Sequence, residues 1–241
     1  MNSAFFNAVA AAYDRPFHER FYRFVAAALA ARLPGELEVE TMLEVGAGAG
    51  FATRVFQDRF PEVRIAALEP AAKMLARGKS RLPGVDWLCR PLAAMPSASF
   101  DLVLSSMSYH WLDRRERQKI KALASGGVLA LALPLSGGAE KSGNLALKRI
   151  LFRLRSGNWP GPARRPRKVA ANIRRQFQDV DFSELIIDEE YESCHDLSRS
   201  LVERGAMRSL FGEQAAMAAS QLAAVAGRAD FRWTIGLFVA W

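Results

Sequence analysis

The chain has 241 residues, of which 50% are hydrophobic and 24% charged, and these proportions exclude a disordered protein and fit one globular domain. No apolar run reaches the roughly 18 to 20 residues that a membrane-spanning helix needs, and no leader pattern is evident, so we expect a cytoplasmic protein. The net charge of +8 is local, because residues 141–178 hold eleven Lys and Arg residues and no acid.

The first half of the chain alternates apolar strands with helical patterns. Residues 17–33 form an amphipathic pattern whose predicted inner face carries Phe17, Phe21, Phe24, Val25 and Leu29. Strands are predicted at 41–45, 63–68, 85–89, 100–107 and 127–134, and helices at 51–60, 71–79 and 114–124. We expect the helix at 71–79 to have Pro70 in its first turn, where the fixed φ of proline fits a helix.

Past Pro134 this alternation stops. A stretch rich in Pro, Gly and Arg precedes further predicted elements, namely strands at 184–192 and 231–241 with helices at 196–207 and 212–227 between them. The pattern predicts an α/β fold: a seven-stranded, mostly parallel sheet with helices on both faces and a helical cap inserted after strand five.

We expect a single domain over residues 1–241. Its parts are an N-terminal helical segment (1–40), a ligand-binding core (41–134), a basic cap (135–182), and C-terminal strands with a helical insertion (183–241). Cys89 and Cys194 lie far apart with no spacing typical of a metal site or a redox pair, so we assign them no role and expect no metal.

The turn after the first strand carries the main functional signal. Gly46, Gly48 and Gly50 follow Glu44 at the carboxyl edge of the sheet, where open α/β sheets bind ligands. A dinucleotide fingerprint would need Gly or Ala where Phe51 stands, and the Lys and Ser or Thr of a phosphate loop are missing. What remains is acid-x-Gly-x-Gly-x-Gly, with a second acid, Glu69, at the end of the next strand.

This pattern resembles motif I of the class I S-adenosylmethionine-dependent methyltransferases, and the resemblance extends over residues 42–134. It implies a Rossmann-like sheet and S-adenosyl-L-methionine as cofactor. By this resemblance Glu69 accepts from the ribose hydroxyls, the glycine turn faces the methionyl part, and Glu44 supports the turn and the amino group. Many relatives carry an acid after strand three for adenine, whereas this chain reads Arg90, Pro91, Leu92, so adenine is expected at the backbone near Leu92.

The segment SSMSYHWLD, residues 105–113, follows strand four. In this family its start lies beside the cofactor, so Ser105 and Ser106 are expected to face the cofactor pocket. Tyr109 and Trp111 are expected at the methyl acceptor, with Trp111 as a wall of the site, and His110 is a candidate catalytic residue that could equally be structural.

The opening FFNAVAAAYDRPF, residues 5–17, resembles that of the malonyl-acyl-carrier-protein O-methyltransferase group of biotin synthesis. In that group the opening folds over the cofactor, so Tyr13 is a predicted catalytic residue and Asp14 a weaker candidate. The resemblance favours O-methylation of a carboxylate, on a small molecule or on an acyl carrier protein. Because a carboxylate is ionised at neutral pH, no general base is needed.

The basic cap supplies candidate contacts to the acceptor. Arg164 and Arg165 are predicted to bind the substrate acid or an acidic carrier protein, and Arg167, Arg174 and Arg175 are further candidates. A solvated basic surface is the simpler alternative. Two other functions stay open: RNA methylation through the same basic segment, and a non-catalytic methyltransferase-fold partner. We also expect Glu69→Ala to weaken cofactor binding with little loss of fold.

Overall fold

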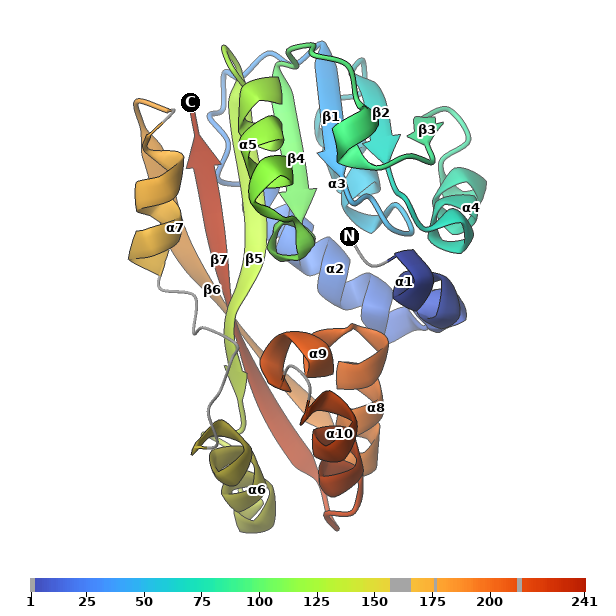
Figure 1. The fold of residues 1–241 in the computed structure, drawn as a ribbon, viewed down its shortest axis with the longest axis vertical. Coiled ribbons are helices and arrows are strands. Elements are labelled where there is room, and N and C mark those ends of the chain that lie inside the picture. The colour runs from blue at the N-terminus through green and yellow to red at the C-terminus, as the bar shows by residue number, and fades with distance from the viewer. Residues whose placement is uncertain (1–2, 157–165, 176, 212–213) are drawn as a thin grey trace. The chain divides into compact units, whose positions relative to one another are not determined.

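A computed structural model describes residues 3–156, 166–175, 177–211 and 214–241. Its strands form one seven-stranded sheet in the order β3-β2-β1-β4-β5-β7-β6 (Figure 1). Their bounds are β1 Thr41–Val45, β2 Arg64–Leu68, β3 Asp86–Leu88, β4 Leu102–Ser106, β5 Val128–Gly138, β6 Val180–Tyr191 and β7 Ala229–Ala240. The predicted α/β architecture is confirmed.

The first five strands pair in parallel. β1 pairs with β2 and β4, β2 with β3, and β4 with β5, with Met42 opposite both Ile65 and Leu102. β1 and the first six residues of β5 are almost wholly buried, as expected of parallel strands covered on both faces. β6 and β7 are antiparallel, because Asp179 and Trp241 exchange backbone hydrogen bonds of 3.3 Å in each direction.

Helices connect and flank these strands. In chain order they are α1 Ser3–Val9, η1 Ala10–Asp14, α2 Pro16–Ala30, α3 Phe51–Arg59, α4 Ala72–Arg81, η2 Leu92–Ala94, η3 Tyr109–Trp111, α5 Arg114–Leu123, α6 Leu145–Ser156, α7 Pro166–Ile173, α8 Cys194–Glu203, α9 Ala206–Phe211 and α10 Ala215–Ala223. A capping box fixes the start of α5, since Asp113 accepts from the Glu116 backbone N–H at 2.8 Å and Glu116 accepts from that of Asp113 at 3.0 Å.

Contacts divide the chain into two compact units. Unit 1 is Met1–Leu133 with Arg167–Ser183 and Gly236–Trp241, and unit 2 is Pro134–Pro166 with Glu184–Ile235. Unit 1 holds the parallel core, and unit 2 holds α6, α8, α9, α10 and parts of the last three strands. The single domain expected from the sequence stays a prediction.

A buried ion pair organises unit 2. Arg204 on the α8 side donates to both carboxylate oxygens of Glu189 on β6, at 2.7 and 2.8 Å. The Trp233 indole N–H, on β7, donates to the same carboxylate at 2.8 Å. These two charges can be buried because Arg204 bonds both oxygens of the Glu189 carboxylate and Trp233 donates a further hydrogen bond to it.

Two local predictions are wrong. The inner face of α2 carries His18, Phe21, Val25 and Leu29, whereas Phe24 is 53% exposed, so the buried stripe is rotated from the one expected. Helix α4 begins at Ala72 after an extended Ala71, so Pro70 precedes the cap and does not lie in the first turn.

Asp101 ties the amino ends of β1 and β4 together. One of its carboxylate oxygens accepts from the Thr41 backbone N–H and hydroxyl, both at 2.8 Å, and from the Glu40 backbone N–H at 3.1 Å. These hydrogen bonds favour the ionised acid, with that of the Thr41 hydroxyl contributing most, and lower the pKa of Asp101 below its ordinary value.

We predict that Asp101→Ala lowers the free energy of unfolding by about 1–2 kcal/mol at pH 7, because a charged acceptor for three donors is lost at a solvent-exposed site. The contribution of Asp101 to the free energy of unfolding is fully present above the ordinary pKa of Asp. It is lost as the pH falls through the lower pKa that Asp101 has in the folded protein. Urea unfolding at pH 7 and pH 3 measures both effects. Asp58→Ala, which removes a surface carboxylate 3.9 Å from Arg54 on α3, is the control. Equal losses of unfolding free energy in Asp101→Ala and Asp58→Ala would contradict the prediction.

Candidate functional site

The glycine turn lies between β1 and α3, at the carboxyl end of the parallel strands. Gly46, Gly48 and Gly50 have φ values of 76°, 57° and 83°, a region that side chains strongly disfavour. The backbone N–H groups of Gly46 and Ala47 donate to the Leu68 carbonyl at 2.8 and 3.1 Å, which fixes the turn to the end of β2. The sequence therefore requires glycine here for backbone shape.

Glu69 follows β2 and supports this turn directly. Its carboxylate accepts from the Gly48 backbone N–H at 2.9 Å and from the Ala71 N–H at 2.7 Å, one donor on each oxygen. The residue is 3% exposed, and burial raises the pKa of its carboxyl group. Each carboxylate oxygen can accept a further hydrogen bond, so capacity remains for two hydroxyl donors.

Glu44 on β1 is the second buried acid. It is 1% exposed and accepts from the Thr53 hydroxyl, in the first turn of α3, at 2.6 Å. Burial raises its pKa to about 8, the Thr53 hydrogen bond opposes this shift, and the charge of Glu69 adds to it. Within the described residues no lysine or arginine pairs with either carboxylate. The site thus favours a cationic ligand.

Ser105 and Ser108 secure the other side of β1. Both hydroxyls donate to the Val45 carbonyl, at 3.2 and 2.5 Å, and lie 2.7 Å from each other. Ser105 is fully buried, so its observed contact is to the strand end, and its predicted contact with the cofactor stays a prediction. Met107, which the sequence did not single out, has a φ of 56° at this edge, a conformation that costs a non-glycine residue energy.

The residues after β4 divide between core and edge. Tyr109 is 3% exposed in a cluster with Leu92 and Met95, and the Arg117 guanidinium lies 5.4 Å from its ring centroid. This packing does not favour the substrate contact predicted for Tyr109. His110 and Trp111 are partly buried, with ring centroids 5.0 Å apart. Their catalytic and substrate roles stay predictions.

The N-terminal segment (residues 3–14, α1 and η1) lies against the glycine turn. Ala10 and Tyr13 pack in one buried cluster with Ala49, Phe51, Ala71 and Met74. The Tyr13 hydroxyl lies 3.2 Å from the Tyr22 hydroxyl, and the Tyr13 ring stacks on the His18 ring at 5.0 Å. Tyr13 is thus beside the turn, while its catalytic role is untested.

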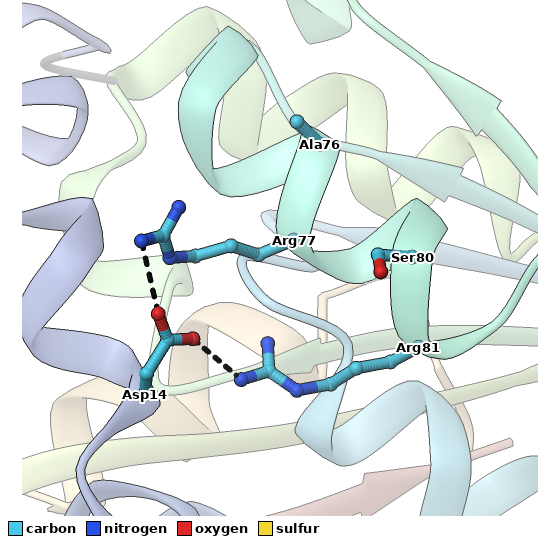
Figure 2. Close-up of a pocket in the computed structure, with 5 residues that line it drawn as sticks. All are labelled: Asp14, Ala76, Arg77, Ser80 and Arg81. Atoms are coloured by element: carbon cyan, nitrogen blue, oxygen red, sulfur yellow. Dashed lines mark hydrogen bonds and ion pairs between the residues drawn. The ribbon is translucent and has the colours of Figure 1, made fainter.

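Asp14 lies apart from this cluster, against α4. Its two carboxylate oxygens pair with Arg77 and Arg81, each at 2.9 Å (Figure 2). Sequence reasoning missed this arrangement, because nothing in the local pattern links residue 14 to a helix more than 60 residues away. These ion pairs are the observed contacts of Asp14, and its expected place in the active site stays a prediction.

The remaining predicted residues fall into two groups. The Leu92 side chain is buried in the core, and the residue opens η2, whose first backbone N–H groups have no partner within the turn. This geometry is compatible with backbone recognition of adenine. Arg164 and Arg165 lie outside the described residues, whereas Arg174 and Arg175 are exposed. In the described part of the chain no cluster of three or more His, Cys, Asp or Glu could hold a metal.

Comparison with known proteins agrees with this geometry. Residues 42–126 match a family described as "Methyltransferase domain". The chain is 31% identical over 110 residues to a trans-aconitate 2-methyltransferase of Azoarcus sp., covering 44% of this chain and 43% of that protein. It is 32% identical over 88 residues to a malonyl-[acyl-carrier protein] O-methyltransferase of Anoxybacillus flavithermus, covering 35% and 34%. The chain thus spans less than half the length of these curated relatives.

A solved structure extends the comparison to the fold. A protein from Anaeromyxobacter dehalogenans, described as a type II methyltransferase, superposes with a TM-score of 0.56 at 19% identity, over 90% of this chain and 95% of that one. Fold and turn together define a Rossmann-like methyltransferase domain. The match of residues 42–126 to the methyltransferase domain family agrees with the resemblance of the core to the class I S-adenosylmethionine-dependent group. In the described ranges no helix is long and apolar enough to span a membrane.

We predict that Glu44 makes folding stability fall as the pH rises. The folded carboxyl group keeps its proton up to about pH 8, whereas the unfolded one ionises at its ordinary value, so the folded state binds more protons between these two pH values. Glu44→Gln keeps an acceptor for Thr53 and removes the titration. Relative to this variant, the wild type should lose about 1–3 kcal/mol between pH 5.5 and 8 in urea unfolding.

The matched control is Glu62→Gln, which neutralises an exposed acid between α3 and β2. Its stability should follow the wild-type pH profile. Parallel profiles of stability against pH for the wild type and Glu44→Gln would show that burial does not raise the pKa of Glu44.

Proposed function

We propose that this chain is an S-adenosyl-L-methionine-dependent methyltransferase that transfers the methyl group to a carboxylate oxygen. One observation carries the proposal: Glu44 and Glu69 are both buried beside a left-handed glycine turn, where burial raises the pKa of each carboxyl group. A ligand that brings positive charge to this place would relieve the cost of the two acids.

The residues fit this cofactor. Its sulfonium and ammonium groups supply the missing charge, and its ribose offers two hydroxyl donors for the acceptor capacity that remains on Glu69. It carries no phosphate, which agrees with a turn that lacks the Lys and Ser or Thr of a phosphate loop. The glycines leave space where side chains would block close approach.

Glu69 and the glycine turn would hold the cofactor, which when bound would supply an activated methyl group for transfer to a carboxylate oxygen of the acceptor. An acceptor carboxylate is already ionised at neutral pH, so no residue has to remove a proton. The protein has to orient the two reactants and exclude water from between them. We assign this task to Tyr13, beside the glycine turn, and to His110 and Trp111, after β4.

The acceptor is proposed from the relatives. Trans-aconitate and the malonyl group are both carboxylic acids, one a free small molecule and the other carried on a protein. Helix α6 of this chain favours the carried acid: it exposes Lys148, Arg149 and Arg153 together with Phe152, which is 73% exposed, around a shallow hollow of about 480 Å³. A basic and apolar surface complements an acidic carrier protein. On this proposal the protein acts in the cytoplasm, with biotin synthesis as one possible setting.

RNA methylation is the alternative that the same basic surface permits. Salt-sensitive retention of RNA in filter binding at near-physiological ionic strength would favour RNA over a carrier protein. The non-catalytic alternative predicts no thermal shift with millimolar S-adenosylhomocysteine.

The proposal is tested by incubating the protein with S-adenosylmethionine and a panel of free and carrier-bound carboxylic acids, with mass spectrometry to detect methyl esters. We expect ester formation by the wild type. In Glu69→Gln, cofactor binding should weaken by about 1.5–3 kcal/mol, because a charged acceptor becomes neutral. Gln keeps an acceptor for one of the Gly48 and Ala71 N–H groups, whereas Ala, for which the sequence predicts little loss of fold, removes both acceptors.

Glu36→Gln, at an exposed acid before β1, is the control and should bind the cofactor like the wild type. Unchanged affinity in Glu69→Gln would remove Glu69 from the cofactor site. Absence of ester from every acid, with cofactor bound, would remove the carboxylate acceptor.

We predict that Lys148→Glu/Arg149→Glu raises KM for a carrier-borne acid about tenfold and leaves KM for the free acid unchanged, because the reversed charges repel an acidic carrier. The wild-type KM for the carrier-borne acid should also rise with salt. Arg114→Glu/Arg115→Glu makes the same charge change on the exposed start of α5 and is the control. Equal effects of both double variants, or equal effects on both substrates, would contradict docking at α6.

A further inference from the structure

The N-terminal segment is fastened along the whole of α4. At the start of the helix, the Asn7 side-chain oxygen accepts from the Lys73 backbone N–H at 2.8 Å, which satisfies a donor of the first turn. Further along, Tyr13 packs on Met74. In the second half of the helix, Asp14 pairs with Arg77 and Arg81. The segment is therefore held at three positions along α4.

The Asp14 contact is the charged member of the three. It borders a pocket of about 410 Å³ that opens to solvent and is lined by Asp14, Ala76, Arg77, Ser80 and Arg81 (Figure 2). Asp14 is 53% exposed, and the two arginines are 28% and 31% exposed. A single pair at this exposure stabilises little, but one carboxylate that bridges two cations forms a small network.

Arg81 connects this network to the glycine turn. One guanidinium nitrogen of Arg81 donates to the Asp14 carboxylate. Another donates at 3.2 Å to the carbonyl of Ala49, a residue inside the turn. Its guanidinium also lies 4.8 Å from the ring centroid of Phe51, the first residue of α3. The same side chain thus contacts the N-terminal segment and the backbone that shapes the ligand site.

We propose that Asp14 is a positioning residue that, through Arg77 and Arg81, latches the N-terminal segment against the glycine turn and sets how long the cofactor stays bound. This inference rests on the proposed function. Release of a ligand seated on the turn requires the covering segment to move, and movement requires the Asp14 pairs to open. Because these pairs are partly exposed, dissolved salt weakens the latch.

Asp14→Asn tests the latch, because it removes the charge and keeps the shape. In the ligand-free variant, the backbone amides of residues 3–14 should exchange hydrogen faster than in the wild type. With ligand, S-adenosylhomocysteine should dissociate about three- to tenfold faster, the effect of losing two partly exposed ion pairs. The wild-type dissociation rate should rise with salt, and that of the variant should not.

Asp58→Asn is the matched control: this acid is 58% exposed, belongs to a surface ion pair of α3, and touches neither the segment nor the turn. Two arginine variants separate the connections. Arg77→Gln removes only a link to Asp14, whereas Arg81→Gln also removes the link to Ala49 and should accelerate dissociation more. Asp14→Asn should add little to Arg81→Gln, because residues of one network do not act additively.

The inference would be overturned if Asp14→Asn kept the wild-type hydrogen-exchange rates of residues 3–14 and the wild-type dissociation rate of S-adenosylhomocysteine. Equal changes of these rates in Asp58→Asn would also overturn it. Failure of the proposed function gives a different result, since the wild type itself would then bind no S-adenosylhomocysteine. The hydrogen-exchange comparison, made without ligand, decides even in that case whether Asp14 holds the segment.

Discussion

Two carboxylates buried beside a turn that only glycine can form are the constraint on which the site depends. Burial opposes the ionisation of Glu44 and Glu69, the charge of Glu69 adds to this effect at Glu44, and hydrogen bonds oppose it at both acids. Glu69 takes two from the turn and the start of α4, and Glu44 takes one from α3. Glu69 therefore builds the turn and also belongs to the proposed ligand site, so its part in folding and its proposed part in binding are coupled.

The surroundings of the turn follow from this coupling. The Gly48 N–H donates to Glu69, and the Gly46 and Ala47 N–H groups donate to Leu68, so these bonds hold one side of the turn. The structure supports its other sides at three places. Ser105 and Ser108 bond the Val45 carbonyl, Arg81 bonds the Ala49 carbonyl, and Tyr13 packs on the cluster below. Rigidity around the turn keeps polar groups in place before a ligand arrives, which reduces the cost of ordering them on binding.

The sequence predicted what depends on local pattern. Continuous apolar runs located the strands, and the glycine spacing with Glu44 and Glu69 located the site. The sequence could not show which of two neighbouring faces of α2 is buried. The predicted face has Phe17, Phe21 and Phe24, the observed face has His18, Phe21 and Val25, and both sets follow helical spacing. The sequence also could not show the Asp14–Arg81 contact, which joins residues 67 positions apart and leaves no periodic signal. The burial of Tyr109 in the core is likewise tertiary, and its predicted contact with the substrate stays a prediction.

The charges of unit 2 bear on the kind of acceptor. A small free acid is best held by a buried arginine with donors to spare, but Arg204 is committed to Glu189 through two bonds, so this pair brings no net charge. In the described part of unit 2, α6 presents positive charge to solvent through Arg149 and Arg153, with Lys148 partly exposed. Exposed charges attract over a distance and orient a large partner, but they coordinate a small ligand poorly. On the proposed function, this distribution favours a carrier-borne acid over a free small acid, because exposed charges can steer an acidic carrier.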